Sequence, residues 1–140
     1  MKKQKFLEHL KNDVYCRIGI SQIHGVGVIA VKDIPQGTTP FKSLNQHKNE
    51  IVTASVEEMK NIGIHKNVIE IARDFFGSSE QNTCDMYHYG PNDINISYYL
   101  NHSINNNIDL IVTDDVYYGF ITNKDIKIGE ELFINYEHYK

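Results

Sequence analysis

Two glycines set two residues apart and followed by β-branched residues constrain this chain more than any other feature of its sequence. They lie in the stretch HGVGVIAVKDIPQG (residues 24–37), where Gly25, Gly27 and Ala30 have the G-x-G-x-x-A spacing of a dinucleotide-binding turn. That turn needs a helix that begins at its second glycine and faces the pyrophosphate. Here β-branched residues favour a strand instead, and a proline and a further glycine close the stretch. The acidic residue that binds a ribose about 20 positions later is matched only loosely, by Glu50. The glycines therefore predict a turn that enters a strand.

The composition indicates one slightly acidic domain. The chain has 140 residues, 41% of them hydrophobic, and a formal net charge of −4, so it is long enough to bury a core. A nucleic-acid-binding protein would carry a basic stripe, whereas only MKKQK at the N-terminus is locally basic, and we expect a solvated, frayed end there. No apolar run is long enough for a membrane span or a signal peptide. We expect a single domain, residues 1–140, that is cytoplasmic or nuclear and binds neither nucleic acid nor membrane.

The cysteines and histidines do not predict a metal site. In such a compartment Cys16 and Cys84 are expected to be reduced thiols. Cys84 and His88 lie four positions apart, but a closed structural zinc site takes four ligands. We therefore expect no metal cofactor.

Short strands separated by turns are predicted over much of the chain. β-Branched residues favour strands at residues 14–20 and 26–31. Further strand-like segments occupy residues 86–90, 94–102 and 108–126. Asp114 and Asp115 lie between two apolar runs and predict a hairpin turn.

The middle of the chain, about residues 42–93, predicts a helical insert. Ser55 and Glu58 have the spacing of a capping box, and Gly63 is expected to separate a short helix from a longer one that ends at Gly77. Apolar residues recur at helical spacing in the longer helix and are expected to pack into the core: Val68, Ile71, Ala72 and Phe75. The fold class is therefore mostly β (α+β), with several small antiparallel sheets and a short helical insert.

Three segments, taken in order, carry the chain's most informative motifs. They are Gly25/Gly27, then Asn101-His102-Ser103 followed by Asn107, and then Gly129-Glu130-Glu131-Leu132 followed by Tyr136. In order and spacing they resemble the signature segments of the SET-domain family, the protein-lysine methyltransferases that use S-adenosylmethionine. The resemblance extends from about Ile18 to Tyr139, with the C-terminal signature at about residues 94–139. It implies a small, stand-alone SET domain of the β-clip type with a knot-like C-terminal crossing.

The resemblance also implies roles for individual residues. Tyr136 is implied to be catalytic, with its hydroxyl directed at the reacting methyl group and nitrogen. Asn101 offers a donor and an acceptor, matched to the ammonium and carboxylate of the cofactor, whereas Glu130 and Glu131 are implied to brace the crossing of the last segment. The residues implied to bind S-adenosylmethionine, or its product S-adenosylhomocysteine, are His24, Gly25, Val26, Gly27, Asn101, His102, Tyr136 and Tyr139.

The chain departs from the family pattern at several positions. Ile104 and Asn106 stand where many members have cysteine and proline, and Asn135 stands where an aspartate commonly precedes the tyrosine. Ile134 stands where the family often has phenylalanine or tyrosine, which limits or permits multiple methylation. Since isoleucine has no hydroxyl, we expect di- or trimethylation unless another aromatic residue fills the channel. The residues expected to line the substrate channel are Ile134, Tyr98, Tyr89 and Tyr118.

The partners and the closure of the site stay open at this level. The sequence ends four residues after Tyr136, without the cysteine-rich segment that closes the lysine channel in many eukaryotic members. Two ways of closing the site remain, by Tyr139 or by a second subunit of a homodimer. A basic, lysine-bearing protein segment is the expected substrate, such as a histone tail or a ribosomal protein. The alternative function is a catalytically inactive SET-fold module that binds a protein, and the retained cofactor residues and Tyr136 argue against it.

Overall fold

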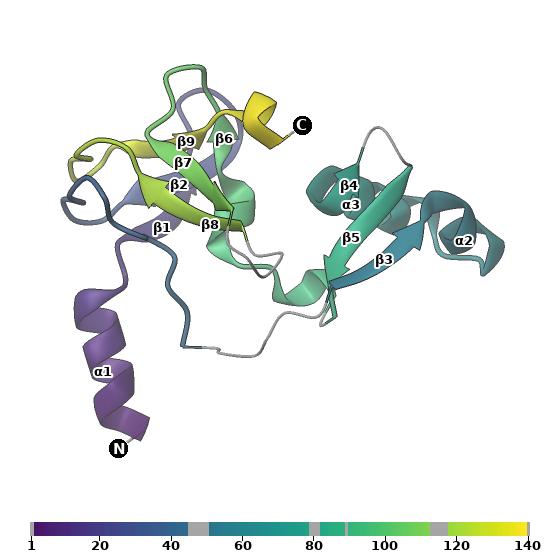
Figure 1. Ribbon diagram of the computed structural model, residues 1–140, viewed down its shortest axis with the longest axis horizontal. Helices are drawn as coiled ribbons and strands as arrows, with labels where there is room; N and C mark the ends of the chain where they lie inside the picture. Colours follow the sequence, from purple (N-terminus) through teal and green to yellow (C-terminus); the bar gives the residue numbers. More distant parts are fainter. Residues whose placement is uncertain (1, 45–50, 79–81, 89, 113–117, 140) are drawn as a thin grey trace. The chain divides into compact units, whose positions relative to one another are not determined.

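The contacts within the chain divide it into two units, Met1–Gln46 with Ile96–Lys140, and His47–Asn95. The computed structural model describes residues 2–44, 51–78, 82–88, 90–112 and 118–139 (Figure 1). Small sheets and short helices make up both units, as the predicted α+β class requires.

The glycine pair opens the second strand of a hairpin in the first unit. β1 (Cys16–Ile20) and β2 (Val26–Ala30) are antiparallel, with Gly19 opposite Gly27. The second glycine therefore continues into a strand rather than starting a helix, which excludes the dinucleotide-binding turn. The register of this hairpin carries residues 24–27 to one end of the sheet.

Two strands distant in sequence complete this sheet, whose order is β1-β2-β9-β6. β9 (Glu131–Ile134) pairs antiparallel with β2, and the two-residue β6 (Asn101–His102) pairs parallel with β9. β9 is therefore central, between the strand that follows the glycines and the strand formed by the asparagine-histidine pair. Figure 1 shows β2, β9 and β6 together in the first unit.

A second hairpin of the first unit is formed by β7 (Ile108–Val112) and β8 (Tyr118–Thr122), which pair antiparallel. The prediction of a hairpin is confirmed, while Asp114 and Asp115 lie outside the described residues.

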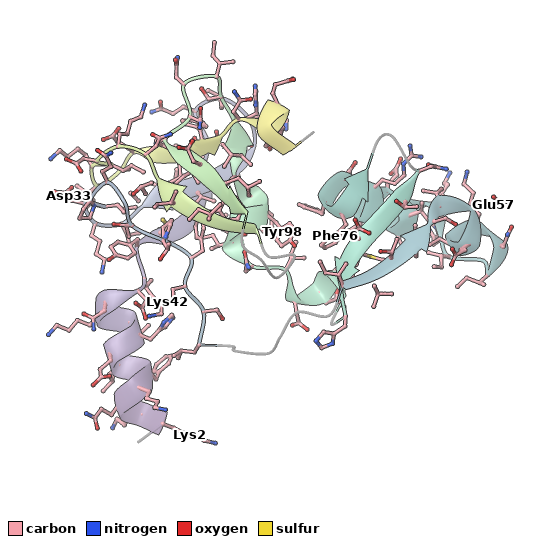
Figure 2. The ribbon with its side chains drawn as sticks, in the orientation of Figure 1. Lys2, Asp33, Lys42, Glu57, Phe76 and Tyr98 are labelled. Carbon is pink, nitrogen blue, oxygen red and sulfur yellow. The ribbon has the colours of Figure 1, made fainter. Side chains whose placement is uncertain are left out.

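The stretch after β2 is a turn, as its proline and glycine predict. Ile34 pairs with Ile126 in an isolated bridge, and Asp33 accepts a hydrogen bond of 2.8 Å from the backbone N–H of Ile128 (Figure 2).

Buried aliphatic side chains from β2, β7, β9 and the connecting segments form one core. β9 contributes every second residue, Leu132 and Ile134, as expected for a strand with one buried face. The buried members of this core are Val28, Ala30, Ile34, Leu100, Ile108, Ile126, Leu132 and Ile134.

Two predictions for the first unit are wrong. The basic N-terminus is a helix, α1 (Lys2–Asn12), with no buried residue, and the Lys32 ammonium donates to the Lys11 carbonyl at 3.0 Å near its C-terminal end. Lysine and leucine are good helix formers, so local propensity favours a helix in this segment.

Residues 94–102 are mostly not a strand. The segment contains η2 (Ile96–Tyr99), a 3₁₀ turn, and only the two residues of β6 are extended. A further 3₁₀ turn, η1 (Pro91–Asp93), begins at a proline that has no N–H to donate to a sheet. Ile96 and Tyr99, at the two ends of η2, both pack against the core, because residues three apart lie on the same side of a 3₁₀ turn.

The second unit is a three-stranded antiparallel sheet with two helices. Its strands are β3 (Ile51–Ser55), β5 (Thr83–Tyr87) and β4 (Gly77–Ser78), in the order β3-β5-β4. α2 (Val56–Asn61) is capped by the Ser55 hydroxyl, which accepts from the Glu58 N–H at 3.0 Å, as predicted. Gly63, with φ +81°, separates it from α3 (Lys66–Phe76), which Gly77 caps.

The predicted buried stripe of α3 is right at Ala72 and wrong at Val68 and Ile71. Val68 and Ile71 are 46% and 42% exposed, whereas Ile69 is buried beside Ala72. The face that packs is Ile69, Ala72 and Phe76, which is also an apolar stripe at helical spacing. The sequence carries two overlapping stripes, and packing against the sheet selects the second.

In the described part of the chain, no helix is long and apolar enough to cross a membrane.

Candidate active site

The side-chain amide of Asn101, the first residue of β6, reaches the segment that contains the glycine pair. Its Nδ2 lies 3.2 Å from the carbonyl oxygen of His24 and 3.0 Å from that of Val26. Carbonyl oxygens only accept, so the amide atom that faces them must be the nitrogen. One side chain thereby joins two of the motifs that the sequence keeps 75 or more residues apart.

A third acceptor for the same nitrogen is the carboxylate of Glu131 at the start of β9, whose Oε2 lies 3.0 Å away. The hydroxyl of Ser21 donates to this carboxylate, at 2.8 Å from Oε1 and 3.0 Å from Oε2. The Ser21 oxygen also accepts from the N–H groups of Ile23 and His24, at 3.1 and 3.2 Å. Glu131 therefore ties the turn before β2 to β6.

The two glycines are needed for different reasons. Gly25 has φ +53°, a left-handed conformation that favours glycine, and a Cβ built on it would meet nothing within 4 Å. A Cβ on Gly27 would lie 2.5 Å from Oε2 of Glu131 and 3.1 Å from Nδ2 of Asn101. Gly27 thus makes room for the bonded carboxylate and amide, a reason internal to the protein.

Tyr136 begins the 3₁₀ turn η3 (Tyr136–Tyr139), directly after the last strand and Asn135. Its backbone N–H donates to Nδ1 of His102 at 2.9 Å, and the two rings lie 5.1 Å apart between centroids. Its hydroxyl donates to the carbonyl oxygen of Leu100 at 2.7 Å. Burial raises the pKa of Tyr136, so the hydroxyl remains protonated and able to hold this bond.

Asn107 fastens the loop after β6 to the central strand. Its Nδ2 donates to the Glu131 carbonyl at 2.9 Å, and its Oδ1 accepts from the Phe133 N–H at 2.7 Å. The Ser103 N–H donates to the Ile134 carbonyl at 2.9 Å. Segment 101–107 therefore follows β9 closely, which positions His102 beside Tyr136.

The residues predicted for the substrate channel are only partly described. Ile134 lies in the core and is 7% exposed, and Tyr98 is half-buried on η2 (Figure 2). Tyr89 lies outside the described residues. Tyr118 begins β8 and Tyr139 ends η3, but their side chains are not described.

Two contributors to the site escaped the sequence-based prediction, the hydroxyl of Ser21 and the carbonyl of Leu100. Ser21 had a signal, because a serine at the start of a turn can accept N–H groups two or three residues later. A backbone carbonyl has no sequence signal. The side chain of Glu130, in contrast, accepts from the Lys127 N–H at 2.7 Å within a turn, and Glu130 reaches β2 through its backbone carbonyl, which accepts from the Ala30 N–H at 2.9 Å.

Within the described ranges, no three or more histidine, cysteine, aspartate or glutamate side chains are grouped so that they could hold a metal ion. Cys84 is fully buried in the core of the second unit, whereas His88 is exposed. The buried members of this second core are Val56, Met59, Ile69, Ala72 and Cys84.

Comparison with known proteins gives a family match over most of the chain. The sequence model of the SET domain matches residues 25–137, a range that includes all three motifs. A comparison with curated proteins gives no match.

Solved structures of similar fold include the following three. A crystal structure of a candidate histone methyltransferase from Plasmodium falciparum is 18% identical, with a TM-score of 0.53, and covers 91% of this chain and 99% of its own. A humanized mutant of the Chaetomium thermophilum Polycomb Repressive Complex 2 bound to an inhibitor is 28% identical, with a TM-score of 0.52 and 89% of this chain covered. The same complex bound to S-adenosylmethionine is 27% identical, with a TM-score of 0.53 and 91% covered. The chain spans only 15% and 16% of the length of these two Chaetomium chains.

Proposed function

The chain belongs to the SET-domain family, and from this premise we propose that it is a protein-lysine N-methyltransferase that uses S-adenosylmethionine. The observation that carries the proposal is the convergence of residues 24–27, Asn101, His102 and Tyr136 around one strand, β9. These residues are far apart in the sequence, and core packing alone does not require polar residues of these types to meet.

The residues at this junction suit the amino-acid end of the cofactor. Asn101 Oδ1 has no hydrogen-bond partner among the described residues, since Nδ2 makes all the bonds of this amide. A free acceptor of this kind fits an ammonium group. Gly25 projects no side chain, and the space beside it is open, so a ligand can approach the backbone there. The Chaetomium structure bound to S-adenosylmethionine supports the same choice of cofactor.

Tyr136 is proposed to orient the target amine. When bound, S-adenosylmethionine supplies a methyl group on a positively charged sulfur. The Tyr136 hydroxyl donates its hydrogen bond to the Leu100 carbonyl, so the lone pairs of its oxygen can accept an N–H of lysine. This contact leaves the nitrogen lone pair free to align with the methyl carbon, and alignment of reactants is a large source of rate enhancement.

The amine must be neutral to react, and lysine ordinarily has a pKa of about 10.4. Activity is therefore expected to rise with pH above neutrality. Because partial burial raises the pKa of Tyr136, the tyrosine is expected to ionise at a higher pH than a free tyrosine and so to limit this rise only at high pH. A pH profile of the initial rate under saturating cofactor measures both effects, and a decline that begins well below pH 10, with the protein still folded, contradicts the role given to the hydroxyl.

Di- or trimethylation is proposed as the end state. Ile134 has no hydroxyl to hold the amine or a water by hydrogen bonding, unlike the tyrosine that often occupies this place in the family. Exhaustive reaction followed by mass spectrometry tests this, and a product that stops at one added methyl refutes it. A basic protein segment, such as a histone tail or a ribosomal protein, is the proposed substrate, and a net charge of −4 is compatible with such a partner.

The first experiment is a calorimetric titration of the whole chain with S-adenosylhomocysteine, because it requires no knowledge of the substrate. Saturable binding at one site is expected. The second is methyl transfer from labelled S-adenosylmethionine to purified histones and ribosomal proteins, with Tyr136→Phe as the inactive variant. Tyr15→Phe is the matched control, since the Tyr15 ring lies 4.4 Å from the Lys32 ammonium and outside the junction.

The two results separate the proposal from its alternative. Loss of transfer in Tyr136→Phe, with cofactor binding and Tyr15→Phe both unaffected, supports the methyltransferase. A chain that binds no S-adenosylhomocysteine at millimolar concentration is not a methyltransferase of this type, and the protein-binding module then becomes the better account.

A further inference from the structure

The geometry points to Glu131 as a positioning residue that, with the carbonyls of His24 and Val26, holds the amide of Asn101 so that its oxygen faces the cofactor. The inference rests on the proposed function, since it concerns the same cofactor site. It assigns to the second glutamate of the glycine-glutamate-glutamate-leucine motif a task in binding, beyond bracing the end of the chain. It also gives Gly27 a specific purpose, because the carboxylate occupies the space that a side chain there would take.

The first step is that the protein itself consumes the donor side of Asn101. Nδ2 carries two protons and lies within 3.2 Å of three acceptors, the carbonyls of His24 and Val26 and the carboxylate of Glu131. A flipped amide would place Oδ1 against three oxygens, which is unfavourable at every contact. Oδ1 is therefore the atom left for a ligand, and Asn101 can serve an ammonium group but not a carboxylate.

The second step is that Glu131 is itself held in place. Ser21, which is only 9% exposed, donates to both oxygens of its carboxylate. The same serine oxygen accepts the N–H groups of Ile23 and His24, so it also sets the turn that presents the His24 carbonyl to Asn101. Carboxylate, hydroxyl and amide form a connected network in which each member orients the next.

The charge of the Glu131 carboxylate is not balanced by a neighbouring cation. Within the described part of the chain, no lysine, arginine or histidine forms an ion pair with Glu131, although its side chain is half-buried. A half-buried carboxylate without a cation favours a positive group nearby. The ammonium of the cofactor supplies one at the adjacent Asn101 Oδ1. Glu131 thus acts on the ammonium through Asn101, because its charged hydrogen bond to Nδ2 holds the amide in place and polarises it toward Oδ1.

The test compares the affinity for S-adenosylhomocysteine of the wild type, Glu131→Gln, Asn101→Ala and the double variant, by calorimetric titration of the full chain. Glutamine keeps the size of the side chain and removes the charge. Because hydrogen bonds to charged groups are stronger than those to neutral groups, we expect Glu131→Gln to bind about tenfold more weakly. Because Glu131 acts through Asn101, the double variant should bind no more weakly than Asn101→Ala alone. Glu130→Gln is the matched control and should bind like the wild type, since the side chain of Glu130 accepts from the Lys127 N–H within its own turn.

The outcomes are separable. If the wild type binds S-adenosylhomocysteine and Glu131→Gln binds it equally well, the positioning role is refuted while the proposed function stands. Multiplied losses in the double variant also refute it, because they show that Glu131 and Asn101 act independently. If the wild type does not bind at all, the proposed function fails first. Should Glu131→Gln melt at a lower temperature than Glu130→Gln, Ser21→Ala tests the same network from its other end. If Ser21→Ala lowers the affinity of the wild type but not that of Asn101→Ala, the inference is supported. If Ser21→Ala leaves the affinity unchanged, the inference is overturned.

Discussion

Removing the side chain of Asn107 is expected to destabilise the first unit more than removing any other side-chain amide in that unit. Asn107 is 8% exposed, and its side chain makes two bonds with the backbone of β9, to the Glu131 carbonyl and from the Phe133 N–H. It therefore replaces a neighbouring strand along part of β9. In Asn107→Ala both backbone groups lose these partners.

The size of the effect follows from the cost of leaving buried polar groups unpaired. Each such group costs about 1–3 kcal/mol, so two of them predict a loss of about 2–6 kcal/mol. A domain of ordinary stability has about 5–15 kcal/mol in total. The substitution should therefore remove a large part of the free energy of unfolding, and the low exposure of Asn107 limits the water that could replace its bonds.

Urea unfolding followed by circular dichroism measures this loss. With a slope of about 2 kcal/mol per M, a loss of about 3 kcal/mol lowers the midpoint by about 1.5 M. Asn105→Ala is the control, because Asn105 is exposed two residues earlier and a surface change of this kind stays within about 0.5 kcal/mol. If the two variants unfold at the same midpoint, the amide of Asn107 does not substitute for a strand, and the reasoning about β9 fails.

Three further predictions test the glycines, the thiol and the second core. Gly27→Ala should lower both stability and affinity for S-adenosylhomocysteine, because a Cβ there would lie 2.5 Å from a carboxylate oxygen; Gly25→Ala should cost only the strain of its φ of +53°, about 1–2 kcal/mol, in thermal unfolding. Burial raises the pKa of Cys16 to about 12, so the thiol stays protonated near pH 8. Its rate of reaction with a thiol reagent should therefore increase up to about pH 12 rather than level off near pH 9. A rate that reaches a plateau near pH 9 in the folded protein contradicts this prediction. Ile69→Ala should cost about 2–5 kcal/mol in urea unfolding because Ile69 is 5% exposed, and Val68→Ala, at 46% exposure, should cost much less; the reverse order would place the other face of α3 against the sheet.

Local features were predictable where one residue type has one use. Ser55 caps α2, Gly63 separates the two helices, and the glycine pair leads into a strand, because capping, left-handed φ and β-branching are decided within a few residues. The prediction failed where two local solutions compete. The buried face of α3 is an example, since Val68 and Ile69 begin equally plausible apolar stripes and only the sheet beneath distinguishes them.

For the site, the sequence predicted which motifs matter but not how they hold one another. Asn101 and Tyr136 were identified through the family resemblance. The hydroxyl of Ser21 and the carbonyl of Leu100 were not, because their partners lie 110 and 36 residues away in the sequence. Contacts over such separations depend on strand order and register, which short-range patterns do not contain.

The sequence by itself determined the family, the mostly β class and the kinds of residue available for chemistry, because motif order, β-branching and turn residues are local properties. Only the tertiary structure decided what each of those residues can do. The insertion of β9 between β2 and β6 brings the Glu131 carboxylate against Gly27 and Asn101. That contact turns an asparagine with two possible orientations into one that offers only its oxygen, since three acceptors already surround its nitrogen.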